Sequence, residues 1–402
     1  MARVSSTYDH GTFPLTRDAA LARLQAFLPM AGCSYASMRN LDLGPNGHQH
    51  VSRLSAALRR RLIGENEVIA TVLGAHGLIA AEKFISEVFW RTYWKGWLEQ
   101  RPIVWAGYLH ALDSERQQLD ANAALARQHA DAYAGRSGID CFDAWASELK
   151  TTGYLHNWAR MQFASIWIFT LGLPWELGAA FMFDRLIDAD PASNTLSWRW
   201  VAGLHTPGKT YLADADRIQK MTGGRFSPIG LARSAIVPTE SIAIPPASAP
   251  RMPGSADHSS PTVLLLTVED LSLETLPALD TLNVRALALM PGETAADRTA
   301  LEDGFTRARL RWPDAVVLGP LTRAALDDAR ISGCGQVVTG FAPVGPTAVR
   351  LELLRQEALQ EGLLFTEHLR AWDRRAWPHC RKGFFALKDK IPTLLKGEGH
   401  KP

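Results

Sequence analysis

Apolar residues recur every three or four positions through the first part of the chain, which is the spacing of one face of an α-helix. The stretches with this period are long enough to be helices, and their apolar faces can pack on one another. The pattern therefore predicts a mostly α-helical domain over residues 12–235. Its predicted helices are residues 18–28, 51–62, 68–79, 81–98, 140–151, 155–171 and 174–186.

The helical pattern ends at a proline-rich stretch. Residues 238–261 hold six prolines with Ser, Ala and Gly between them, which predicts an extended linker over residues 236–261. Beyond it, short apolar runs alternate with helix-like stretches, as in a small parallel sheet. A smaller α/β domain is therefore expected over residues 262–395. Its predicted strands are residues 263–268, 284–290, 315–318 and 336–339.

Composition narrows the function classes. The 402 residues are 47% hydrophobic and 21% charged, which fits a folded globular protein and excludes a mainly disordered one. The formal net charge is only +2, so attraction to nucleic acid must come from a local basic surface. Residues 1–12 contain no apolar signal segment, and the longest apolar run, residues 163–175, is too short to cross a bilayer. We therefore expect a cytoplasmic protein with no membrane role.

The four cysteines lie far apart and form no pair with metal-ligand spacing, so we expect reduced thiols and no metal site. Two of them fall in the helical domain, which is too few for an iron–sulfur cluster. The cysteines are Cys33, Cys141, Cys334 and Cys380.

Tryptophan is frequent and unevenly placed. The chain has 13 tryptophans, and ten of them lie between Trp90 and Trp200. A tryptophan on an apolar helix face usually belongs to the core, and an arginine with an aspartate, such as Arg160 and Asp188, can be an ordinary buried ion pair. Single residues of this segment therefore identify no function.

The same segment, however, holds several motifs in a fixed order, and two more precede it. Together they resemble the FAD-binding domain of the DNA photolyase and cryptochrome family, over residues 12–235. The motifs are Tyr35-Ala-Ser-Met-Arg39, Ser52-Arg-Leu-Ser55, Phe84-Ile-Ser-Glu-Val-Phe-Trp-Arg91, Gly153-Tyr-Leu-His-Asn-Trp-Ala-Arg-Met161, Leu186-Ile-Asp-Ala-Asp190 with Asn194, and Trp198-Arg-Trp200.

The resemblance implies an FAD cofactor. Ser52 and Ser55 would offer hydroxyl and backbone N–H groups to its diphosphate at a helix start, although the same residues suit a plain helix cap. Arg160 would pair with Asp188 beside the flavin ring, and Asn194 would face the ring's N5, where a neutral amide favours the reduced flavin. The full set implied to bind FAD is Tyr35, Ser52, Arg53, Leu54, Ser55, Arg91, Arg160, Asp188, Asp190 and Asn194.

The resemblance also implies a pocket for a flipped pyrimidine dimer, because photolyases act on bases turned out of the helix. Trp90 and Trp200 would form its apolar wall, and Glu87 and Asn157 would bond the lesion. Met161, with Asn157, favours a cyclobutane dimer over a (6-4) photoproduct. Basic residues near the pocket could contact DNA phosphates or mark only a solvated face; they are Arg91, Arg199, Lys209, Arg217, Lys220 and Arg225.

Trp198 and Trp175 match the first two members of the family's electron-transfer chain. The third, outermost tryptophan has no counterpart near residues 115–130. Four other tryptophans could replace it, namely Trp97, Trp105, Trp145 and Trp158.

The sequence therefore predicts a light-driven, FAD-dependent photolyase that splits cyclobutane pyrimidine dimers in UV-damaged DNA, acting as a monomer. The alternatives are a cryptochrome-like blue-light sensor and a flavoprotein that binds damaged DNA without repairing it. A sensor has no need for Glu87, Asn157, Met161 and the two pocket tryptophans. The α/β domain is either the family's antenna domain, permuted to the C-terminus, or an unrelated fusion.

Overall fold

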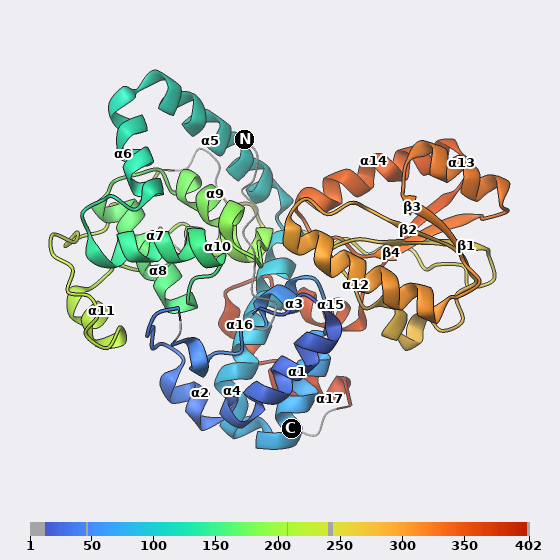
Figure 1. Cartoon of the computed structure of the whole chain (residues 1–402), viewed down its shortest axis with the longest axis horizontal. Coiled ribbons are helices and arrows are strands. Elements are labelled where there is room, and N and C mark those ends of the chain that lie inside the picture. The colour runs from blue at the N-terminus through green and yellow to red at the C-terminus, as the bar shows by residue number, and fades with distance from the viewer. Residues whose placement is uncertain (1–12, 46, 207, 240–243, 400–402) are drawn as a thin grey trace.

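The computed structural model describes residues 13–399 apart from 46, 207 and 240–243. A helical region and a smaller α/β region lie side by side (Figure 1). The predicted domain start at residue 12 and part of the predicted linker, residues 240–243, fall outside the described residues. This arrangement confirms the predicted fold class.

The helical region follows the predicted pattern and adds helices to it. Its helices are α1 (Arg17–Phe27), α2 (Cys33–Met38), α3 (Ser55–Arg59), α4 (Glu65–Glu99), α5 (Pro102–Ala121), α6 (Ala123–Ala134), α7 (Asp140–Thr152), α8 (Asn157–Ser165), α9 (Trp175–Arg185), α10 (Pro191–Val201) and α11 (Ala215–Met221). The predicted helices 68–79 and 81–98 are the two parts of α4, which bends at Gly77, where the backbone takes φ 67° and ψ 170°. The predicted helix 155–171 continues from α8 into a π-helical turn, Ile166–Thr170.

Two differences from the predicted helices have local causes. The predicted helix 51–62 shrinks to α3 because Arg53 and Arg61 have positive φ, 58° and 49°, and interrupt the helix on both sides. Helices α5 and α6 were not predicted, although both have start signals. Pro102 stands in the first turn of α5, and Asn122 caps α6 by accepting from the N–H groups of Ala124 and Leu125, each at 3.1 Å.

The α/β region contains one parallel sheet in the order β3-β2-β1-β4-β5. Its strands are β1 (Thr262–Leu266), β2 (Val284–Leu289), β3 (Val316–Pro320), β4 (Gln336–Gly340) and β5 (Leu364–His368), and its crossover helices are α12 (Ala295–Arg311), α13 (Arg323–Ile331) and α14 (Pro346–Gln360). Strands β1 and β4 are buried throughout, which matches their continuous apolar runs. Strand β5 was not predicted because it is an edge strand in which buried and accessible residues alternate.

After β5 the chain returns to the helical region. It forms α15 (Ala371–Ala376), α16 (Phe384–Lys388) and α17 (Ile391–Gly397), and α15 and α16 pack on α4 (Figure 1). The Trp372 indole donates a hydrogen bond to Thr92 Oγ1 at 2.9 Å, and Gln100 Nε2 donates to the Trp377 carbonyl at 2.7 Å. The part of the predicted α/β domain beyond His368 therefore packs with the helical region.

Helix α4 has the length and apolar composition of a membrane-spanning helix. In this fold it packs against α2, α5, α10, α15 and α16. Its charged residues Glu65, Lys95 and Glu99 are buried and lie near opposite charges. These contacts explain why α4 is apolar, since it packs as a core helix of this fold.

Candidate functional site

Two buried carboxylates lie on the segment between α9 and α10. Asp190 caps α10 by accepting from the Ser193 N–H at 2.8 Å, and it lies 3.0 Å from Arg91 and 3.8 Å from Lys95 of α4. Asp188 lies 3.3 Å from Arg160 of α8. Three helices thus bring the predicted residues Arg91, Arg160, Asp188 and Asp190 together.

Both carboxylates remain ionised. Burial opposes ionisation of Asp188, but Arg160 and Arg91 outweigh it and lower its pKa. Burial likewise opposes ionisation of Asp190, and Lys95, Arg91 and Arg59 lower the pKa of this carboxyl far below its usual range. The site therefore combines fixed negative and positive charges in a dry interior.

The turn before α3 approaches these carboxylates. Leu54 is fully buried, and the Arg53 side chain donates from Nε to the His48 carbonyl at 3.0 Å. The Ser55 hydroxyl is buried near Asp188, and within the described residues neither it nor Lys95 Nζ makes a hydrogen bond of normal geometry. Buried polar atoms without such a bond are rare, so these two fit a site that accepts a polar ligand.

Two further predicted cofactor residues are placed differently. Asn194 is buried and donates from Nδ2 to the Ala179 carbonyl at 2.8 Å, which orients its amide. Tyr35 packs between Phe27 and Phe84, at ring distances of 6.0 and 5.3 Å. Burial raises the pKa of Tyr35, with Glu87 and Arg39 as its nearest charges, so Tyr35 is associated with these two residues.

The five predicted lesion residues share one property: each is partly or fully accessible, although buried residues surround it. They are Glu87, Trp90, Asn157, Met161 and Trp200, and we call them the outer face. Within the described residues, no ring contact joins Trp90 to Trp200. Trp90 instead stacks on Phe384 of α16, with ring centroids 3.8 Å apart and planes 12° apart, and Trp200 packs on Tyr211 at 5.5 Å.

Glu87 forms an ion pair with Arg39, the last residue of the motif that begins at Tyr35. Burial raises the pKa of the Glu87 carboxyl, and Arg39 offsets part of that rise. A carboxyl held in this way can accept or donate a hydrogen bond at the outer face.

Three consecutive arginines, Arg59, Arg60 and Arg61, join the site to the α/β region. Arg59 makes two bonds to Glu269, at 2.6 and 2.7 Å, and Arg60 makes two to Asp297, at 2.7 and 2.9 Å. The same arginines hold the segment that carries the carboxylates, because Arg60 donates to the Ile187 carbonyl at 2.9 Å and Arg59 to the Ala189 carbonyl at 3.4 Å. This link was not predicted. Its one trace in the sequence is the run of three arginines that begins four residues after Ser55.

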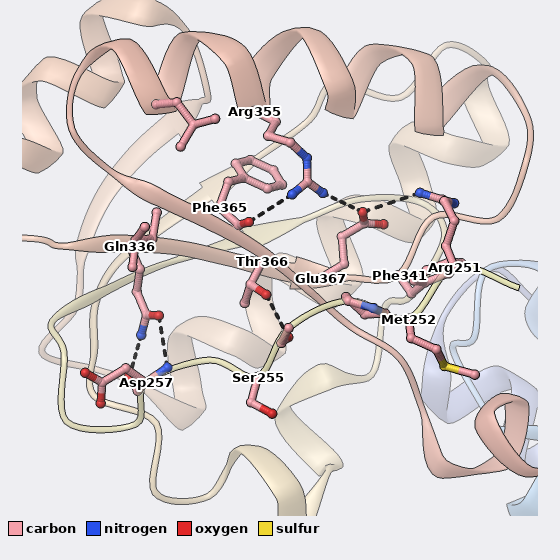
Figure 2. Close-up of a pocket in the computed structure, with 14 residues that line it drawn as sticks. Arg251, Met252, Ser255, Asp257, Gln336, Phe341, Arg355, Phe365, Thr366 and Glu367 are labelled. Atoms are coloured by element: carbon pink, nitrogen blue, oxygen red, sulfur yellow. Dashed lines mark hydrogen bonds and ion pairs between the residues drawn. The ribbon is translucent and has the colours of Figure 1, made fainter.

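A cavity of about 460 Å³ lies elsewhere, between linker residues 251–257 and the sheet edge at β5 (Figure 2). Its polar groups bond to one another: Arg355 to Glu367 at 2.8 Å, and the Thr366 hydroxyl to the Gly254 carbonyl at 2.8 Å. These contacts fasten the linker to the sheet. None of the predicted site residues lines this cavity.

Comparison with known proteins shows similarity to photolyases over part of the chain. Residues 84–224 match the family described as the FAD binding domain of DNA photolyase. A deoxyribodipyrimidine photo-lyase of Thermus thermophilus is 31% identical over 221 residues, which cover 53% of this chain and 48% of that protein. Those of Streptomyces griseus and Escherichia coli are 34% and 26% identical, over 39% and 51% of this chain and 32% and 43% of theirs. The chain thus spans less than half the length of these relatives.

Two solved structures show likeness over about half of this chain. A class III photolyase from Agrobacterium tumefaciens is 26% identical, with a TM-score of 0.42 over 52% of this chain and 43% of that chain. A Synechocystis cryptochrome is 20% identical, with a TM-score of 0.40 over 55% and 46%. On these matches, residues 84–224 of this chain are similar to the FAD-binding domain of DNA photolyase.

Proposed function

We propose that this protein is a light-driven DNA-repair enzyme that splits cyclobutane pyrimidine dimers. The observation that carries the proposal is the placement of neighbouring residues on two helices. On α4, Trp90 is at the outer face while Arg91 pairs with Asp190 inside. On α8, Asn157 is exposed and Arg160 pairs with Asp188. A flavin held by the inner charges would therefore lie close behind a dimer bound at the outer face.

The inner residues would hold and orient the cofactor. Arg160 and Asp188 would bind the polar edge of the flavin ring, and Asp190 would bind its N3 side and ribityl region. The Ser55 hydroxyl and the turn at Ser52–Ser55 would bind the diphosphate, with Arg53 as a cation. Asn194 would accept a hydrogen bond at N5. FAD held here in its reduced form would supply the light-driven one-electron chemistry that opens the cyclobutane ring.

The outer-face residues would bind the flipped dimer. Trp90 and Trp200 offer apolar ring surface, on which unstacked bases can rest and regain part of the energy lost on flipping. Glu87 would hydrogen-bond the dimer and stabilise it while it carries the extra electron. Asn157 would bond the carbonyl edge of the bases, and Met161 would leave room for a cyclobutane dimer.

The proposed partner is UV-damaged DNA, bound by a monomer in the cytoplasm. Lys209, Arg217 and Lys220 are exposed and would contact phosphates beside the lesion. Because such contacts release counterions, binding should weaken as the salt concentration rises.

The direct test is repair of a UV-irradiated oligonucleotide by purified protein whose flavin has been chemically reduced. Under blue light the dimers should revert to thymines, and in the dark they should persist. Absence of repair with a fully reduced, stoichiometric flavin would refute the enzyme and leave a sensor or a DNA-binding flavoprotein. The accessibility of the five outer-face residues supports the enzyme, since a sensor has no need for them.

A further inference from the structure

The aromatic rings near Trp175 continue outward on α5. Trp175 contacts Tyr108 with ring centroids 5.5 Å apart, and Tyr108 contacts Trp105 at 5.4 Å. Their interplanar angles are 31° and 43°, and both distances fall in the range of interacting aromatic pairs. Of the four tryptophans considered from the sequence, only Trp105 reaches Trp175 through ring contacts among the described residues, and it does so through a tyrosine.

The inner end of this series is Trp198 of α10, which, among the described residues, approaches Trp175 through α9 and not through a direct ring contact. Trp198 lies against Gly178 of α9, where an added Cβ would be 2.4 Å from its ring, and Gly178 is one turn along α9 from Trp175. Exposure rises along the series: Trp198 and Trp175 are each 2% exposed, Tyr108 is 5% and Trp105 is 8%. All four rings are buried, and Trp105 is the most exposed of them.

A second series of rings also starts at Trp198 but is interrupted. Trp198 contacts Trp167 at 6.2 Å, and Trp167 contacts Phe181 at 6.1 Å and His129 at 5.8 Å. Tyr133 is the next ring on both branches, at 4.5 Å from Phe181 and 6.1 Å from His129. Phenylalanine and neutral imidazole lose an electron far less readily than tryptophan or tyrosine. Of these two series, as the described residues form them, only the one through Tyr108 consists of oxidisable rings throughout.

We propose that Tyr108, continued by Trp105, is the outer electron donor through which this protein reduces its flavin in light. The inference rests on the proposed function, since it needs bound FAD. With FAD bound, Trp198 would pass one electron to the cofactor, Trp175 would reduce oxidised Trp198, and Tyr108 would reduce oxidised Trp175. Oxidised Tyr108 would release its phenolic proton, and it would take a proton back when a soluble thiol returns the electron through Trp105. In sum, the thiol would lose one electron and one proton, the electron would reach the cofactor, and the proton would enter solvent.

The experiment compares Tyr108→Phe with Tyr133→Phe, which makes the same change on the interrupted series. Both variants keep the ring, and FAD content and the far-ultraviolet circular dichroism spectrum check that each is folded and loaded. After a light flash at low temperature, electron paramagnetic resonance of the unmodified protein should show a tyrosyl radical. In the unmodified protein, deuteration of the tyrosine rings should change the hyperfine pattern of this radical signal, which would assign the signal to a tyrosine. The signal should be lost in Tyr108→Phe and persist in Tyr133→Phe.

Flavin photoreduction with a thiol present should slow several-fold in Tyr108→Phe, and also in Trp105→Phe, relative to Tyr133→Phe. A tyrosyl signal that survives in Tyr108→Phe, or unchanged photoreduction in that variant, would overturn the inference. Repair by unmodified protein whose flavin was reduced with dithionite separates the two proposals. Failure of that repair would refute the proposed enzyme, while the radical measurement would still decide the role of Tyr108.

Discussion

Two regions that share α4 and α8 differ in how they are built. The inner region, which we call the charged layer, comprises Asp188, Asp190, Lys95, the arginines Arg59–Arg61, and Arg91 and Arg160. Its charges lie close to opposite charges, and all are buried except Arg91 and Arg160, which are partly buried. The outer face carries one charge, on Glu87, and its two indoles, its amide and its thioether are also accessible.

This difference indicates which residues stabilise the fold. A buried charge that loses its partner is strongly unfavourable, so changes in the charged layer should affect stability and cofactor binding together. An accessible side chain contributes less to the fold, so changes at the outer face should affect DNA binding and repair with little loss of stability. The predictions below test this division, beginning with the largest effect.

Glu269→Gln should have the largest effect. The Glu269 carboxylate binds Arg59 at 2.6 Å and accepts from the Thr347 hydroxyl at 2.9 Å. The neutral amide keeps the shape but leaves Arg59 buried without its counter-charge, which should lower the free energy of unfolding by about 3–5 kcal/mol. Because Arg59 also holds the Ala189 carbonyl, FAD occupancy should fall. Urea unfolding and the flavin-to-protein absorbance ratio measure both effects.

The matched control is Asp327→Asn, which breaks the exposed pair of Asp327 with Arg330 at 2.8 Å. This change should alter the free energy of unfolding by less than about 0.5 kcal/mol. If the two variants were equally stable, the α/β region would not support the charged layer.

His156→Asn should change the dependence of stability on pH. His156 is buried directly before Asn157, and burial, with His48 and Arg160, lowers its pKa from the ordinary 6.5 to about 4 against the opposing effect of Asp42. As the pH falls below 6.5, the His156 side chain therefore binds a proton in the unfolded chain, whereas in the folded protein it binds one only near pH 4. Stability from this group is present above pH 6.5 and is lost as the pH falls to about 4, by about 3 kcal/mol.

Asparagine suits this position because His156 caps α8 by accepting from the Trp158 N–H at 3.2 Å, which an Asn side chain can also do. Urea unfolding between pH 4 and pH 6.5 should show a smaller loss in the variant than in the unmodified protein. The exposed His110 on α5 provides the control, and His110→Asn should leave the loss unchanged. An equal loss in all three proteins would assign it to other groups.

Glu87→Ala should reduce repair without loss of FAD. If Glu87 bonds the dimer, its removal should raise the barrier to repair by about 1.5–3 kcal/mol, which slows repair by roughly tenfold to a hundredfold. Repair per absorbed photon and the FAD content of the same sample give the two readouts. Glu82→Ala is the matched control on α4, since Glu82 pairs with Lys388 on the protein surface. Loss of FAD from the Glu87 variant would show that Glu87 supports cofactor binding and would contradict its proposed role in binding the dimer.

The charged layer was predicted only in part. The family resemblance paired Arg160 with Asp188, and these residues lie 3.3 Å apart. It also named Arg91 and Asp190 as cofactor residues, but their ion pair with each other was not predicted. The link from Arg59 to Glu269 joins residues 210 positions apart, and no local pattern encodes such a partner. Tyr108 was not predicted as an electron donor, because only tryptophans were considered for that position. Its contact with Trp175 depends on the packing of α5 against α9, which no local sequence pattern indicates.

Phe384→Leu should have the smallest effect and tests the boundary between the two regions. Phe384 is buried and stacks on Trp90, so α16 helps to fix one wall of the proposed pocket. Leucine keeps an apolar side chain there but removes the ring pair, which should lower the free energy of unfolding by about 0.5–1.5 kcal/mol. If the stack orients Trp90 for the dimer, the dissociation constant for dimer-containing DNA should rise, whereas that for undamaged DNA should not.

The control is Phe385→Leu. It changes the adjacent residue, which is 72% exposed, and should alter neither the free energy of unfolding nor the dissociation constant for dimer-containing DNA. Weaker lesion binding in Phe384→Leu alone would show that the C-terminal helices complete the outer face, and unchanged binding would limit them to a role in stability.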